Sequence, residues 1–161
     1  MTKHICPCCD KPVDLAVGEP SSLLPDAALA VPGRRMKGNS DYFRVDDRFF
    51  VRGVVPFAVQ GVETPFRWGV WVELGSEDDF HRILDLHNDP EQGSEPAFEV
   101  KLANDLLCYE ETLNLPCKLQ LTGTRTRPAV LFTEDVDHPF AAEQRAGVSP
   151  HRIGEWMEHF S

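Results

Sequence analysis

Between residues 41 and 74 the apolar side chains follow the spacing of β-strands. The stretch "DYFRVDDRFFVRGVVPFAV" holds two runs rich in aromatic and β-branched residues, on either side of Asp46-Asp47. This pattern predicts a strand, a tight turn at the two aspartates and a second strand. The stretch "FRWGVWVEL" is predicted to form a central strand, with Val70 and Val72 on the face opposite to Trp71.

The spacing changes to that of a helix in "GSEDDFHRILDLH". Ser76, followed three residues later by Asp79, is typical of the start of a helix, where a hydroxyl caps a free backbone N–H. Apolar residues then recur at helical spacing. The face predicted to pack inward consists of Phe80, Ile83, Leu84 and His87.

Three more strands and two helices are predicted farther along the chain. The stretches "AFEVKL", "CKLQLT" and "PAVLFTE" have the composition of strands. Pro139 suits the first turn of a helix over "PFAAEQRA", and Gly147 suits its end. Ser149-Pro150 opens a second helix, whose apolar face consists of Ile153, Trp156, Met157 and Phe160.

Residues 1–40 lack any such period. Five prolines and three glycines interrupt them, so we predict an irregular N-terminal arm that is mostly coil and packs on the sheet. Residues 41–161 are predicted to form a single α+β domain: an antiparallel sheet with helices packed on it, ending in a C-terminal helical hairpin. A chain of 161 residues is long enough to bury such a core.

Composition adds a strong acidic charge to this picture. The formal net charge is −10, from 16 basic and 26 acidic residues. Such a field repels phosphate backbones and anionic lipid, so we predict no nucleic-acid partner and no membrane partner. The charge by itself suits solubility or a basic partner, and the partner we predict is a protein. The sequence has no run of 18 apolar residues and no signal-peptide core, which predicts a cytoplasmic protein with reduced thiols.

Four stretches occur in a distinctive order: "FFVRG", "FRWGVWVEL", "YEETLNL" and "DHPFAAEQRAGV". Together they resemble a family of bacterial proteins that carries the domain of unknown function 2199. The resemblance implies no reaction. It does imply an N-terminal Cys-x-x-Cys-Gly-x-x-His pattern and a further cysteine before the first strand. In this sequence Asp10 replaces the glycine, and Val13 and Phe43 stand where the histidine and the later cysteine are expected.

The stretch "HICPCCDKP" raises the question of a metal site. Cys6 and Cys9 have the spacing of a zinc knuckle, but a structural zinc needs four protein ligands. The other candidates are Cys8 and His4 nearby, and Cys108 and Cys117 far along the chain. Because two positions of the implied pattern are changed, we predict no zinc at full occupancy, with zinc held by Cys6, Cys9, Cys8 and His4 as the open alternative. A redox pair is disfavoured because no amphipathic helix follows Cys9.

Residues 139–161 have the helix, turn and helix spacing of a DNA reader. Acidic side chains outnumber arginines in this segment, whereas phosphate contacts supply most of the affinity of such readers. We therefore expect the two helices to cap the sheet through their apolar faces.

The stretch "EDVDHPFAAEQR" concentrates titratable groups, and it suggests an acid–base centre. The catalytic candidates are His138, Glu143 and, from the strand region, Arg52. A simpler interpretation is local: Asp137 or His138 caps the helix, and Glu143 pairs with a nearby cation.

The favoured interpretation of the whole sequence is a non-catalytic protein-binding module, for example an immunity-type inhibitor of a basic toxin domain. The alternative is an enzyme with an acid–base or metal site around His138 and Glu143. A pocket in which Arg52, His138 and Glu143 converge would favour the enzyme. No cofactor is predicted beyond the zinc alternative.

Overall fold

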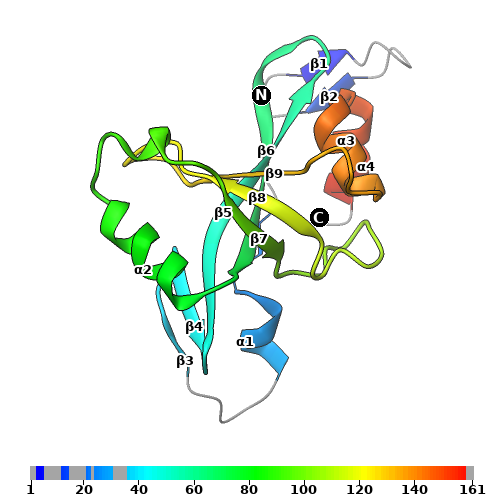
Figure 1. The fold of residues 1–161 in the computed structure, drawn as a ribbon. Helices are drawn as coiled ribbons and strands as arrows, with labels where there is room; N and C mark the ends of the chain where they lie inside the picture. The colour runs from blue at the N-terminus through cyan, green and yellow to red at the C-terminus, as the bar shows by residue number, and fades with distance from the viewer. Residues whose placement is uncertain (1–2, 6–11, 15–20, 23, 31–35, 159–161) are drawn as a thin grey trace.

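A computed structural model of the chain describes residues 3–5, 12–14, 21–22, 24–30 and 36–158 (Figure 1). The strands are β1 (Lys3–Ile5), β2 (Pro12–Asp14), β3 (Met36–Gly38), β4 (Tyr42–Val45), β5 (Arg48–Val59), β6 (Val62–Leu74), β7 (Phe98–Leu102), β8 (Pro116–Gln120) and β9 (Ala129–Leu131). The helices are α1 (Asp26–Ala30), α2 (Glu77–Leu86), α3 (Pro139–Ala146) and α4 (Pro150–Glu158), with a 3₁₀ turn, η1, at Gln92–Ser94.

Seven strands form one sheet in the order β3-β4-β5-β6-β7-β8-β9, and neighbouring strands are antiparallel. An additional parallel pairing joins β5 to β9, with Val54 opposite Ala129. This pairing closes the strands from β5 to β9 into a ring, and β4 and β3 extend beyond it. In Figure 1, α2 lies near one end of the long β5–β6 hairpin, and α3 and α4 lie near its other end. Ile83 of α2 and Phe140 of α3 belong to the same buried core, so these helices cover the same face of the sheet. The predicted α+β fold is confirmed, whereas the ring closure was not predicted.

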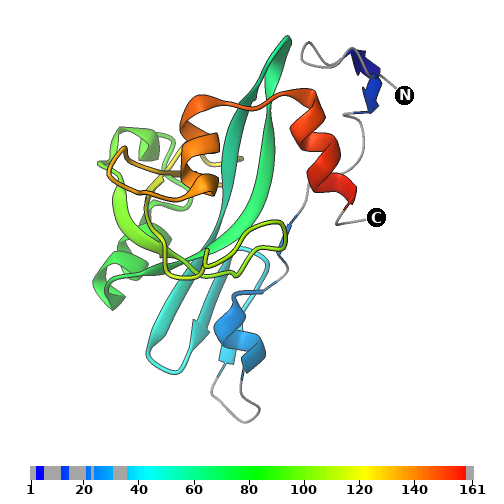
Figure 2. The same cartoon turned by 90° about the vertical axis from the view of Figure 1, so that its right-hand side faces the viewer.

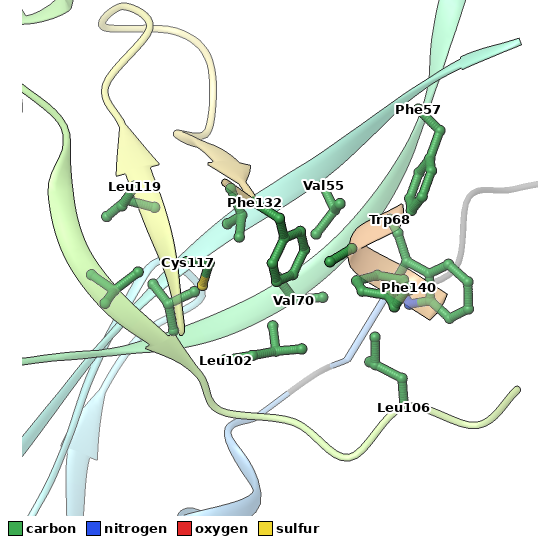
Figure 3. Close-up of a cluster of buried hydrophobic side chains, with 14 of the residues drawn as sticks. Val55, Phe57, Trp68, Val70, Leu102, Leu106, Cys117, Leu119, Phe132 and Phe140 are labelled. Carbon is green, nitrogen blue, oxygen red and sulfur yellow. The ribbon is translucent and has the colours of Figure 1, made fainter. Parts of the chain in front are cut away.

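The long hairpin of β5 and β6 divides the interior into two cores. Val70 and Val72 lie in the larger one, the main core, where side chains from β5 to β8 and α3 point toward one another (Figure 3). Trp71 lies in a smaller second core with Phe50 and Val45. All of these side chains are buried. The predicted central strand and its alternation are therefore confirmed, since period two sends neighbours to opposite faces.

Residues close together in the sequence set the start of α2 and the turn of the β4–β5 hairpin. Asp46 adopts a left-handed conformation (φ 53°) in the turn between β4 and β5, as the two aspartates predicted. Ser76 caps α2, and its hydroxyl accepts a hydrogen bond from the backbone N–H of Asp79 at 3.1 Å. The predicted inward face needs a correction, because Leu84 is 37% exposed and His87 is exposed, whereas Leu86 is buried beside Ile83.

The two C-terminal helices are found where the sequence predicted them. Pro139 opens α3, and Gly147 follows its last residue with φ 85°, a conformation that glycine adopts without strain. Ile153 and Trp156 of α4 are buried in the main core, where the Trp156 ring contacts Phe57 and other aromatic rings. Figure 2 shows both helices beside the long hairpin. The expectation that they cap the sheet is confirmed, whereas Phe160, which was predicted on the same apolar face, lies outside the described residues.

The N-terminal arm can be compared with its prediction only in its described residues. These include β1 paired with β2, the five-residue helix α1, and β3 at the edge of the large sheet. The proline spacing did not predict these short elements. Besides β3, backbone hydrogen bonds join the arm to the sheet: the N–H of Ser22 donates to the carbonyl of Gly69 on β6, and that of Asp26 to the carbonyl of Ala103 just after β7.

Candidate functional site

The candidate site lies where one edge of β5 changes its partner. The backbone N–H of Arg52 donates to the carbonyl of Asp41, at the start of β4, over 2.9 Å. Two residues later, the N–H of Val54 donates to the carbonyl of Pro128, just before β9, also over 2.9 Å. Because alternate residues of a strand bond along the same edge, β4 and β9 meet this edge in succession. The two strands diverge beyond it and leave an opening beside Arg52.

A cavity of about 660 Å³ occupies this opening. Such a volume is in the range of pockets that hold small organic molecules. Its walls come from β5, β6, the α2 region and the loop between β8 and β9. The charged and imidazole side chains that line it are Arg52, Arg67, Arg125, Arg127, His87 and Asp41, and the apolar ones are Val51, Val54, Ile83, Leu121 and Pro128. A chain with a net charge of −10 thus places four arginines and one carboxylate around one cavity.

Arg52 is the buried cation of this cavity, with only 9% of the residue exposed. Its guanidinium donates to the carbonyl of Ser40 at 3.4 Å and to the hydroxyl of Ser21. Its Nε has no partner within the described part of the chain, and no carboxylate there lies within ion-pair distance of it. Burial, followed by the nearby charge of Arg127, lowers the pKa of Arg52. A buried charge without a bonded counter-ion is costly, so this group favours an anion.

Arg127 and Arg125 bring further positive charge from the loop that precedes β9. The Nε of Arg127 lies 3.3 Å from Oδ1 of Asp41, and both side chains are 43% exposed. Arg125 is exposed, and its side chain makes no hydrogen bond or ion pair with any described residue. Guanidinium groups remain protonated and donate in a planar fork, so they bind anions but do not shuttle protons.

Tyr42 and His87 form another part of the wall. The Tyr42 hydroxyl and Nδ1 of His87 are 2.6 Å apart, and the two rings meet edge to face. Burial, with a smaller effect of Asp41, raises the pKa of Tyr42. The side chain of Gln92 donates to the carbonyls of Leu86 and His87, which fixes the end of α2 against the cavity.

Two of the three predicted catalytic candidates lie elsewhere. His138 caps α3: its Nδ1 accepts from the N–H of Phe140 at 3.0 Å, and its Nε2 lies 2.7 Å from the carbonyl of Glu110. These bonds correspond to a neutral ring with the proton on Nε2. Both nitrogens are therefore engaged in holding the helix start, as the simpler interpretation predicted. Neither His138 nor Glu143 lines the cavity, so the structure does not bring them together with Arg52.

Glu143 belongs to a polar cluster that joins α3 to α4. The Nε of Arg152 donates to Oε2 of Glu143 at 2.8 Å, and the Tyr109 hydroxyl donates to Oε1 at 2.6 Å. The indole N–H of Trp156 donates to the same hydroxyl at 3.1 Å. Burial and the bond to Glu143 raise the pKa of Tyr109. Glu143 pairs with a cation, as predicted, and both of its carboxylate oxygens are occupied.

Most of the predicted metal ligands cannot be compared with the structure. Cys6, Cys8 and Cys9 lie outside the described residues, and for His4 only the backbone of β1 is described. Among the described residues no three His, Cys, Asp or Glu side chains group so that they could hold a metal ion. Cys117 is a buried part of the main core, and Cys108 is half-buried against it. The zinc prediction remains untested.

Arg52 was predicted as a candidate from the sequence, whereas the residues that surround it in the cavity were not. Arg125 and Arg127 lie in "LTGTRTRPAV", a segment in which only the strand at its end was predicted. Alternating threonines and arginines after a glycine were a usable signal for an anion-binding loop. Arg67 and His87 gave no comparable signal, because nothing in their neighbourhoods indicated that β5 and β9 would meet.

In the part of the chain that the structure describes, no helix has the length and apolar character needed to cross a bilayer. A family model described as "Uncharacterized protein conserved in bacteria (DUF2199)" matches residues 5–148. No curated protein and no solved structure matches the chain.

Proposed function

The chain belongs to this uncharacterized bacterial family, DUF2199, whose description assigns no activity, so we propose a function from the site alone. We propose that the protein is a non-catalytic binding protein and that the cavity around Arg52 takes an anionic small molecule. The observation that carries the proposal is the state of Arg52. It is a buried guanidinium beside a 660 Å³ cavity, with an unpartnered Nε and no bonded carboxylate among the described residues.

Energetics support the proposal. A charged hydrogen bond contributes roughly 1.5–3 kcal/mol, and a buried donor left unpaired costs a comparable amount. An anion that binds beside Arg52 supplies the missing counter-charge. The remaining cavity arginines add attraction at the mouth, where solvent weakens each contribution.

The test is a titration with inorganic phosphate and with pyrophosphate, followed by amide chemical shifts in NMR spectra. We expect saturable shifts at residues that line the cavity, such as Arg52, Gly69 and Arg125. The Arg127→Gln variant, altered at a half-exposed side chain that leaves the core intact, should weaken binding about tenfold.

Arg48→Gln is the matched control, because the side chain of Arg48 is 41% exposed and pairs with a carboxylate, as that of Arg127 does, but Arg48 does not line the cavity. This variant should bind both anions like the unaltered protein. If neither anion produces saturable shifts at the cavity, or if Arg48→Gln and Arg127→Gln weaken binding equally, the proposal is wrong.

A second candidate is the protein partner expected from the sequence, with an immunity-type inhibitor of a basic toxin as one version. The net charge of −10 supports it, because complementary charge accelerates the encounter of two proteins. A cytoplasmic location belongs to the same proposal. Co-expression with the product of a neighbouring gene tests it: relief of a growth arrest supports the idea, and no relief by a stably expressed chain contradicts it.

The enzyme alternative around His138 and Glu143 has less support. Both ring nitrogens of His138 and both carboxylate oxygens of Glu143 are engaged in hydrogen bonds that join α3 to its surroundings. An acid–base catalyst needs a group that can reach its substrate with a proton or a lone pair available.

A further inference from the structure

The charge around the cavity indicates how many negative charges its ligand carries. Three arginines, 52, 125 and 127, line the cavity together with one carboxylate, that of Asp41. The formal charges of these four side chains leave an excess of two positive charges. Arg67 also lines the cavity but is not counted, because it has an interaction of its own. A dianion balances this excess, whereas a monoanion leaves a cation unpaired in a partly desolvated site.

The distribution of donors favours a tetrahedral anion over a planar one. Arg52 approaches from β5, whereas Arg125 and Arg127 approach from the loop before β9, so guanidinium groups reach the cavity from two walls. Thr124 and Thr126 also line it. Three terminal phosphate oxygens point in different directions and can meet donors on both walls. A carboxylate directs its two oxygens into one plane.

The size and the apolar wall of the cavity indicate that the ligand carries more than the anion. A water molecule takes up about 30 Å³ in the liquid, and a phosphate group is only a few times larger. The cavity of about 660 Å³ leaves most of its volume to another group. Tyr42, Val54 and Pro128, which line the cavity and are only partly buried, contribute apolar surface against which an organic body can be buried.

Asp41 already acts as an internal anion in this cavity. Its Oδ1 accepts a hydrogen bond from Nε of Arg127. Among the described residues, each of these two side chains forms its ion pair with the other. A ligand phosphate that binds Arg127 has to compete with this carboxylate and is repelled by it. Removing the charge of Asp41 should therefore strengthen the binding of an anion.

From these observations we infer that the ligand is a phosphate monoester with an apolar organic body, and that its phosphate displaces Asp41 from Arg127. This inference rests on the proposed anion-binding function of the same cavity. It goes further by naming the ligand class and the carboxylate that opposes binding.

The experiment compares three probes by isothermal titration calorimetry: phenyl phosphate, inorganic phosphate and phthalate. Phthalate carries two carboxylate groups on the same ring, so it shows whether binding needs the phosphate group or only the charge and the ring. We expect phenyl phosphate to bind at least about tenfold more tightly than either other probe. Asp41→Asn should tighten phenyl phosphate several-fold, and Arg127→Gln should weaken it about tenfold.

The outcomes separate the inference from the proposed function. If all three probes bind with similar affinity and Arg127→Gln weakens them all, the anion site stands and the ligand class is wrong. If phenyl phosphate binds more tightly but Asp41→Asn weakens it, the displacement of Asp41 is wrong. If no probe binds in a way that depends on Arg127 or Arg125, both the inference and the proposed function fail. Arg48→Gln again serves as the control and should change nothing.

Discussion

Tyr109 connects three parts of the chain through one hydroxyl. That hydroxyl donates to Glu143 on α3 and accepts from the indole of Trp156 on α4, while the Tyr109 ring packs edge to face against Phe140. Arg152 lies over the rings of Tyr109 and Trp156 and completes the cluster. The cluster holds the two C-terminal helices against the main core, so its role is structural.

We predict that Tyr109→Phe lowers the free energy of unfolding at neutral pH by about 1–3 kcal/mol, because the glutamate and the indole lose a buried partner. The pH dependence should also change. The pKa of Tyr109 is raised above its ordinary value of 10.0, so above pH 10 the unfolded chain loses the proton that the folded chain retains. Stability therefore falls as pH rises above about 10.

The measurement is urea unfolding of both proteins from pH 7 to 11. The variant should be less stable below pH 10 and should lose less stability above it. An equal alkaline loss in both proteins would show that Tyr109 is not responsible.

The N-terminal cysteines give a second prediction at this scale. We predict less than one zinc per chain in protein purified without chelator, because Val13 and Phe43 stand at two of the positions where ligands are implied. Elemental analysis of the protein and of a Cys6→Ser variant tests this. One zinc per chain that is lost in the variant would overturn the prediction.

At the scale of elements, the contact of β5 with β9 creates the site. Gly53 lies at the point of contact, and a Cβ atom there would be 2.8 Å from Cγ2 of Val130 and 3.0 Å from the carbonyl oxygen of Pro128. The glycine thus allows the close approach of the two strands. The same approach directs the loop with Arg125 and Arg127 toward Arg52.

We predict that Gly53→Ala destabilises the protein by about 1–3 kcal/mol, because the added methyl group has to push β9 away from β5. Gly75→Ala is the control, since nothing lies within 4 Å of a Cβ atom at that position. Thermal unfolding measures both. Similar melting temperatures for the two variants would contradict the importance of the close approach.

Local sequence signals were sufficient for most elements but not for their lateral contacts. Ser76, Pro139 and Gly147 marked the ends of helices because capping depends on residues only a few positions apart. The exposure of Leu84 and the burial of Leu86 could not be predicted from such local signals. Which side of α2 is buried depends on how the helix lies across β5 and β6.

At the scale of the whole molecule, an acidic protein contains a basic cavity. The net charge of −10 acts at long range, where salt screens it within about 10 Å, whereas the arginines act at short range in a partly enclosed space. A small anion can enter such a space. A polyanion meets the acidic surface first.

We therefore predict that the protein does not bind duplex DNA in a gel-shift assay at low salt, despite its cluster of arginines. The negative field opposes the phosphate contacts that supply non-specific affinity. A complex that dissociates as salt is added would contradict this prediction, and its loss in Arg125→Gln would indicate that DNA contacts the cavity loop.

The sequence by itself determined the order of the strands and helices from β4 to α4, the alternation that separates Val70 from Trp71, and the residues at which α2, α3 and α4 begin. These features depend on side-chain periodicity and on backbone groups close together in the chain. Only the tertiary structure decided that β5 pairs with β9 and that Arg52 meets Arg125 and Arg127. These contacts join residues more than seventy positions apart, and no local preference specifies them. They form because a closed ring of strands buries apolar side chains and leaves fewer free edges.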